Sequence, residues 1–184
     1  MAEAEWFETE DELDEIQRAF VSALRARAAC WPLSPADTCL VLPDYVAYGY
    51  ELAPGETGHG RLLAYLHVPD PTQNVILLTV GAYFDRERVR GDELHNQLLS
   101  LPDEPTPLAL EGTGTPEELA ERTADWFETV LGRPIVRHEW LRLGKVYAHR
   151  WLFADSGQPL AEGRIRAKEL GPPDRVVGVR GQLR

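Results

Sequence analysis

The sequence contains only two cysteines, Cys30 and Cys39, and no CxxC spacing. Two thiols in a chain of this length do not make a disulfide framework, so we expect both to be reduced and buried. No apolar run approaches the roughly 18 residues of a membrane-spanning helix. The N-terminus begins with acids instead of the basic segment that opens a signal peptide. These absences argue against a disulfide scaffold and predict a cytoplasmic protein that does not enter membranes.

The charge of the chain is strongly negative and unevenly distributed. With a net charge of −11 and a pI near 4.9, the protein is expected to bind neither nucleic acid nor anionic membranes. Residues 1–16 carry eight acids and no side-chain base, whereas residues 162–184 carry six bases. One interpretation is a solvated helix start and a flexible tail. The other is that the two ends meet, within or between protomers, and this second interpretation suggests a homodimer.

Length and composition indicate one globular domain. The chain has 184 residues, of which 43% are hydrophobic and 27% charged, so it can bury a sizeable core. No internal repeat or linker divides it. We therefore predict a single domain over residues 1–166 and a basic, flexible tail over residues 167–184.

The first half of the chain changes from a helical pattern to strand patterns. Thr9 and Glu12 match a capping box, and apolar residues recur at helical spacing behind them, which predicts a helix over residues 9–28. β-Formers between turn residues then predict strands within residues 39–84, at 39–53, 61–68 and 73–84. The loop GETGHGR at 55–61 lacks the GK[ST] ending of a phosphate-binding loop, so we interpret it as a hairpin loop.

The middle of the chain predicts helices on both sides of a loop. Residues 85–101 favour a helix, chiefly over its second part from Asp92. Residues 101–115 contain three prolines and are expected to form a loop. A cap, a proline at the first helical position and a terminal glycine then predict a helix over 115–132, with Trp126 and Phe127 in the core.

The last part of the chain returns to a strand pattern. Residues 135–154 predict a hairpin around Leu143-Gly144, and residues 159–166 are a candidate third strand. The element order α-βββ-α-α-ββ(β) predicts an α+β fold with a mostly antiparallel sheet of about five to six strands and helices packed on one face. Small regulatory domains and secretion-chaperone-like domains have similar orders.

The hairpin carries the residues that most strongly suggest a site. With a two-residue turn, Arg142 pairs with Lys145, so that His138 faces His149 and Trp140 faces Tyr147 on one side of the sheet. A three-residue loop would shift the register by one and set Glu139 opposite His149. We prefer the first register, which groups the candidate partner- or ligand-binding residues His138, Trp140, Tyr147, His149 and Trp151, with Arg137 and Arg150 beside them.

The two histidines do not by themselves make a metal site. Zinc needs three protein ligands for catalysis or four for a structural site, and His138 and His149 supply two. His67 is a candidate third ligand, but nothing in the sequence fixes its distance. We therefore expect no metal and no cofactor; the histidines either pack in a sheet face or belong to a polar binding surface.

No complete catalytic signature occurs in the chain, and two functional hypotheses remain. The first is a non-enzymatic protein-interaction or regulatory, chaperone-like module that binds a protein partner through its aromatic, His- and Arg-bearing sheet face. The second is an enzyme or sensor that binds a small anionic ligand through Arg137, Arg150, His138 and His149. Exposed, contiguous aromatic side chains would favour the first, and a concave pocket with converging arginines the second.

Overall fold

The computed structural model describes residues 5–42, 61–95, 98–163 and 170–181. The chain divides into two compact units: unit 1 comprises residues 1–67 and 79–128, and unit 2 comprises residues 68–78 and 129–184. None of the helices in the described ranges is both long and apolar enough to cross a bilayer.

Unit 1 is built on a five-stranded antiparallel sheet, sheet A. Its strands follow the chain in the order β1-β2-β3-β4-β5. Their bounds are β1 Thr38–Val41, β2 Leu62–Asp70, β3 Val75–Asp85, β4 Arg88–Glu93 and β5 Leu110–Thr113. The ends of β2 and β3, with the turn that joins them, belong to unit 2. Short turns join β2 to β3 and β3 to β4, because antiparallel neighbours need only a turn between them, whereas longer segments connect β1 to β2 and β4 to β5.

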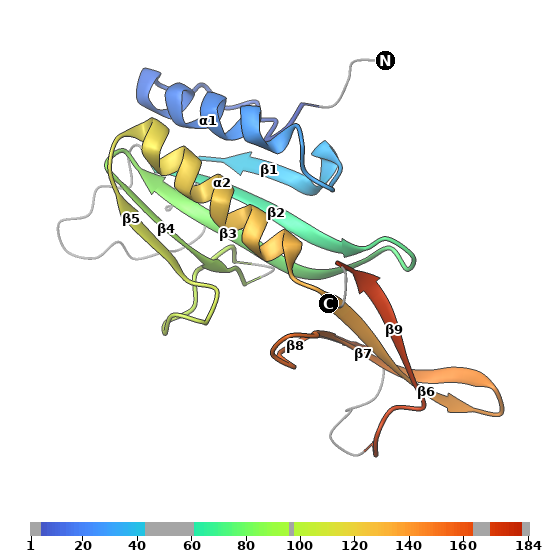
Figure 1. The fold of residues 1–184 in the computed structure, drawn as a ribbon. Helices are drawn as coiled ribbons and strands as arrows, with labels where there is room; N and C mark the ends of the chain where they lie inside the picture. The colour runs from blue at the N-terminus through green and yellow to red at the C-terminus, as the bar shows by residue number, and fades with distance from the viewer. Residues whose placement is uncertain (1–4, 43–60, 96–97, 164–169, 182–184) are drawn as a thin grey trace. The chain divides into compact units, whose positions relative to one another are not determined.

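Two helices cover one face of sheet A, and both lie on the same side of it in Figure 1. These are α1 Glu15–Ala28 and α2 Pro116–Gly132, and a short 3-10 helix, η1 Pro35–Asp37, precedes β1. Phe20 of α1 stacks on Phe84 of β3, with ring centroids 4.2 Å apart. The ring of Trp126 in α2 lies against Gly91 of β4, where a Cβ would come within 3.1 Å of it. The predicted packing of helices on one sheet face is therefore confirmed.

The first helix begins later than predicted, at Glu15. Asp14 and Gln17 form the capping box, with the Asp14 Oδ1 accepting from the Gln17 N–H at 2.9 Å. Thr9 instead accepts from the Asp11 N–H in a local turn. The chain before Asp14 stays non-helical because Phe7 is fully buried and its N–H donates to the Thr38 hydroxyl of β1.

The helix predicted within residues 85–101 is wrong. Residues 88–93 form β4, which pairs with β3 through a two-residue turn at Arg86-Glu87. Arg86 has a φ of 52°, a conformation that Asn or Gly usually adopts, and neither residue marks this turn in the sequence. The predicted loop 101–115 likewise contains β5, while the predicted helix 115–132 is confirmed from its Thr115–Glu118 capping bonds onward.

Unit 2 contains a second antiparallel sheet, sheet B, in the order β8-β7-β6-β9. The strands are β6 Ile135–Arg142, β7 Lys145–Phe153, β8 Pro159–Gly163 and β9 Arg175–Arg180. The predicted hairpin is confirmed, and so is its third strand over Pro159–Gly163, while residues 164–166 of that prediction lie outside the described residues. Residues 175–180 of the predicted flexible tail form β9 and pair with β6, so this part of the chain is integrated into the sheet. The α+β class is confirmed, with the strands divided between two sheets.

Three smaller expectations have different outcomes. Cys30 is exposed and Cys39 half-buried, which corrects the prediction that both are buried; a helix end and an edge strand leave them near the surface. Phe127 is fully buried as predicted, whereas Trp126 is half-buried because its indole N–H reaches the Leu108 carbonyl. The later part of the 39–53 strand and most of the 55–61 loop lie outside the described residues.

Candidate functional site

The predicted hairpin register holds at the turn and fails beyond it. Arg142 pairs with Lys145 as expected, and Leu141 with Val146. A β-bulge then inserts Tyr147 as an extra residue, so Trp140 pairs with Ala148 and Glu139 with His149. The pairing of His138 with His149 is therefore wrong, because one extra residue in a strand shifts every later side chain to the opposite face.

The bulge separates the predicted site residues onto two faces of sheet B. His138 pairs with Arg150, whereas Arg137 pairs with Trp151 and shares its face with His149. Trp140 and Trp151 are buried, and only Tyr147 among the predicted aromatics is exposed. The four groups predicted to hold an anion, Arg137, Arg150, His138 and His149, thus do not converge on one place.

The face with Arg137 carries a buried ionic network. Asp70, whose side chain is fully buried, accepts from the Arg137 Nη1 at 2.9 Å and from the Trp151 Nε1 at 2.8 Å. The Arg137 Nε donates to Glu139 at 2.7 Å, and Arg175 of β9 binds the other Glu139 oxygen. Each carboxylate is fully paired, so the network fixes the β2–β3 turn and β9 against β6 and has a structural role.

The network and the histidines beside it have shifted pKa values. Burial alone would raise the pKa of Asp70, but hydrogen bonds from Thr72, Trp151 and Arg137 outweigh it and lower the pKa. Burial likewise opposes the arginine contacts at Glu139, which lower its pKa overall. For His149, burial and then the Arg137 charge lower the pKa; for His138, burial and then Arg150 lower the pKa.

We expect acidification to destabilise the protein in two ranges. His138 and His149 have lowered pKa values, so they bind protons less readily in the folded state than in the unfolded state. The free energy of unfolding therefore falls as the pH drops below about 6.5, the pKa of histidine in the unfolded chain. The lowered pKa values of Asp70 and Glu139 add stability that is complete above about 4.5 and is lost as the pH falls through the folded values. Urea denaturation at about pH 8, 5.5 and 3.5 measures both losses. Equal or rising stability on acidification would contradict this sign.

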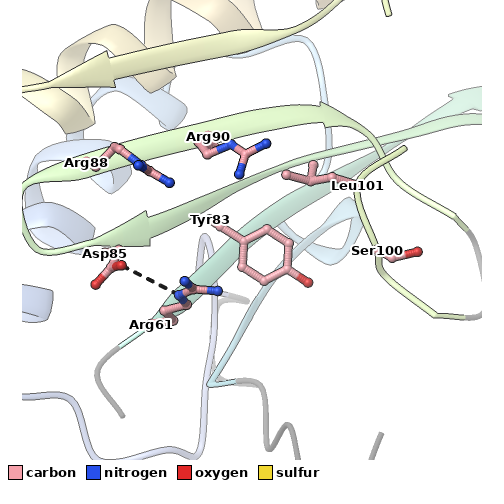
Figure 2. Close-up of a pocket in the computed structure, with 7 residues that line it drawn as sticks. All are labelled: Arg61, Tyr83, Asp85, Arg88, Arg90, Ser100 and Leu101. Carbon is pink, nitrogen blue, oxygen red and sulfur yellow. Dashed lines mark ion pairs between the residues drawn. The ribbon is translucent and has the colours of Figure 1, made fainter. Parts of the chain in front are cut away.

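A concave pocket lies elsewhere, on sheet A in unit 1 (Figure 2). Its volume is about 170 Å³, and its lining residues are Arg61, Tyr83, Asp85, Arg88, Arg90, Ser100 and Leu101. Tyr83 is paired with Arg90 across the sheet, and Asp85 with Arg88. These residues alternate with Phe84, Val89 and Gly91, which are buried on the helix side. The pocket is therefore on the face of sheet A opposite the helices.

Three guanidinium groups surround this pocket against a single carboxylate. The Arg61 Nε lies 3.6 Å from the Asp85 Oδ2, an ion pair drawn as a dashed line in Figure 2. The Arg90 Nε lies 3.8 Å from the exposed Glu111. Arg88 is exposed and has no ion-pair partner within the described part of the chain. The Tyr83 hydroxyl donates to the Leu99 carbonyl at 2.7 Å, which holds the wall that Ser100 and Leu101 form. The pocket is a local positive site on an acidic protein.

The sequence contains a signal for this pocket that helical periodicity concealed. Arg88 and Arg90 stand two residues apart, as do Tyr83 and Asp85, which is the spacing of side chains on one face of a strand. The Asp-Arg-Glu-Arg run resembles a helix start, and a helix would send Arg88 and Arg90 in different directions. The pairing of β4 with β3 as a hairpin is therefore what places both arginines on one face of the sheet.

Metal binding has no support in the described ranges. There, no group of three or more His, Cys, Asp or Glu side chains lies close enough together to hold a metal ion. The proposed third ligand, His67, contacts Thr79 through its Nδ1 at 2.9 Å in unit 1, while His138 and His149 belong to unit 2. No protein-family model, curated protein or solved structure matches the chain.

Proposed function

We propose that this chain is a binding protein for an anionic ligand, a carboxylate or a phosphate group, which occupies the arginine pocket of sheet A. The observation that supports it is the convergence of Arg61, Arg88 and Arg90 on one concavity. Guanidinium groups present planar, paired donors that match carboxylate and phosphate oxygens. The proposal keeps the ligand class expected from the sequence and moves the site from sheet B to sheet A.

Binding is favoured over catalysis by the chemistry of the lining groups. Arginine stays protonated at all ordinary pH values, so it can hold an anion and cannot act as a general base. The Tyr83 hydroxyl already donates to a carbonyl, and Asp85 faces Arg61. These groups are suited to orienting an anion, and none is a nucleophile activated by a neighbouring base. A sensor or carrier role follows more directly than an enzymatic one.

Removing one pocket arginine should weaken anion binding with little effect on the fold. We expect Arg88→Ala and Arg90→Ala each to raise the dissociation constant for inorganic phosphate or citrate about tenfold, since a hydrogen bond to a charged group contributes about 1.5–3 kcal/mol. Isothermal titration calorimetry at low salt measures this effect. Arg122→Ala, which removes an exposed charge from α2 on the helix side, is the matched control.

The calorimetry also separates a specific pocket from general attraction. Specific binding should be lost in the pocket variants and kept in the Arg122 variant at the same ionic strength. If the unaltered protein binds neither phosphate nor citrate, or if all three variants bind equally, the pocket is not an anion site. A protein-interaction role is a second candidate, favoured by the exposed side chains of Leu143, Val146 and Tyr147 at the β6–β7 turn of sheet B.

A further inference from the structure

The turn between β6 and β7 contains a residue that the fold does not explain. Leu143 and Gly144 have φ values of 51° and 74°, so both central residues of the two-residue turn are left-handed. Such turns favour Asn-Gly or Asp-Gly, because a branched side chain is strained in this conformation. Leu143 is also 97% exposed, so packing within the chain does not compensate for the strain. A strained and exposed leucine points to a contact outside its own chain.

The residues around Leu143 extend this feature into a surface, the hairpin tip, which comprises Arg142, Leu143, Lys145, Val146 and Tyr147. Val146 and Tyr147 are 41% and 40% exposed, and the bulge presents Tyr147 as the extra residue of β7. Arg142 and Lys145 are exposed and opposite each other. From 140 to 150 the sequence contains no acid. The tip is thus apolar and positively charged on a chain whose net charge is −11.

A hollow in unit 1 has the opposite character. It has a volume of about 620 Å³, and its lining combines acidic with apolar side chains. The acids are Glu5, Glu8, Glu10 and Asp11, and the apolar residues include Pro35 and Val41. Glu5 is paired with Arg25, and Asp11 accepts from the Leu42 N–H. Glu8 and Glu10 are exposed, and neither has an ion-pair partner within the described ranges. This acidic groove leaves two carboxylates available beside an apolar floor.

We propose that the hairpin tip of one copy of this chain docks into the acidic groove of a second copy. Leu143 and Tyr147 would cover the apolar floor, while Arg142 and Lys145 would meet Glu8 and Glu10. A second copy is the expected partner because of charge complementarity: the basic and apolar groups of the hairpin tip match the acidic and apolar groups of the groove. An anionic bilayer is a poorer partner, because the net charge of −11 repels it. The hairpin tip and the acidic groove are different surfaces. If each of two copies places its tip in the groove of the other, a closed dimer forms; if each copy docks onto a further copy, an open filament forms.

The strain at Leu143 provides a variant that separates docking from folding. Leu143→Asn replaces the leucine with a residue that tolerates the left-handed turn, so its melting temperature should be equal or higher. Its self-association, measured by sedimentation velocity on the full chain over a concentration series at low salt, should weaken at least about tenfold, as loss of a central interface contact does. Ile76→Asn, at an equally apolar site that is 50% exposed, is the control and should associate normally.

A charge exchange tests the partner surface itself. Lys145→Glu and Glu10→Lys should each weaken self-association, and the two variants mixed should associate with each other because the opposite charges are restored. Glu12→Lys changes an exposed acid outside the groove lining and should have little effect. A protein that is monomeric at every concentration and salt, a Leu143→Asn variant that associates like the unaltered chain, or a mixture without recovery would each overturn the proposal.

Discussion

Replacing Asp70 with alanine is expected to lower the free energy of unfolding by about 3–5 kcal/mol, because it breaks a buried ion pair and leaves the Arg137 guanidinium with one carboxylate, Glu139, in place of two. The Asp70 side chain is fully buried and the Arg137 side chain is 11% exposed. The change also removes the acceptor of the Trp151 indole N–H. Urea denaturation followed by circular dichroism at about pH 7 gives the loss.

Two comparisons identify the cause of this loss. Asp155→Ala breaks the surface pair with Arg133 in the same unit, where both groups are partly solvated, and should cost less than about 1 kcal/mol. The double replacement of Asp70 and Arg137 should be less destabilising than the sum of the single ones, because each single replacement already removes the same Asp70–Arg137 ion pair. Equal losses for the Asp70 and Asp155 variants would mean that the network contributes no more than a surface ion pair.

Replacing Phe127 with alanine should destabilise unit 1 by about 3–5 kcal/mol, as truncation of a large buried aromatic side chain does. Its ring is fully buried, stacks on Phe7 at a centroid distance of 6.2 Å and meets Trp31 edge-on at 5.6 Å. These contacts join α2 to the segment before α1 and to the one after it. Thermal and urea unfolding of the variant measure the effect.

Trp126→Phe is the matched change on the same helix. Trp126 is half-buried, and this substitution keeps an aromatic ring while removing the indole hydrogen bond to the Leu108 carbonyl. The expected loss is about 0.5–1.5 kcal/mol, that of a single hydrogen bond. If the Trp126 variant loses more than the Phe127 variant, the core of unit 1 is centred on Trp126 instead.

The two proposals rest on separate surfaces and can fail independently. The anion pocket uses Arg88 and Arg90 on the open face of sheet A. The docking surface uses the β6–β7 turn and the acidic groove, and neither contains a residue of the pocket. Loss of anion binding in the Arg90 variant should therefore leave self-association unchanged, and the Leu143 variant should bind phosphate normally.

The elements that the sequence predicted best are those whose local signals agree with one another. The helix 115–132 has a capping threonine, a proline at its first position, an apolar stripe and a terminal glycine, and all four indicate the same bounds. The β6–β7 turn lies at Leu143-Gly144 as predicted, because strand patterns flank it on both sides. Where several short-range signals agree, they determine the bounds of the element, and tertiary contacts change those bounds little.

The sequence by itself thus determined the α+β class, most of the strands and the second helix. It also showed that the chain is acidic, contains many arginines and lacks a complete catalytic motif. Only the tertiary structure decided the register beyond Leu141, because a single bulged residue, Tyr147, moves each later side chain to the opposite face without changing the strand pattern. Residues 88–93 also form a strand only because they pair with β3, through a turn in which Arg86 adopts a left-handed conformation without an Asn or Gly to indicate it. This pairing places Arg88 and Arg90 in one pocket. Local periodicity indicates which residues are buried. Which side chains from distant parts of the sequence come into contact depends instead on strand pairing, and strand pairing is a property of the whole sheet.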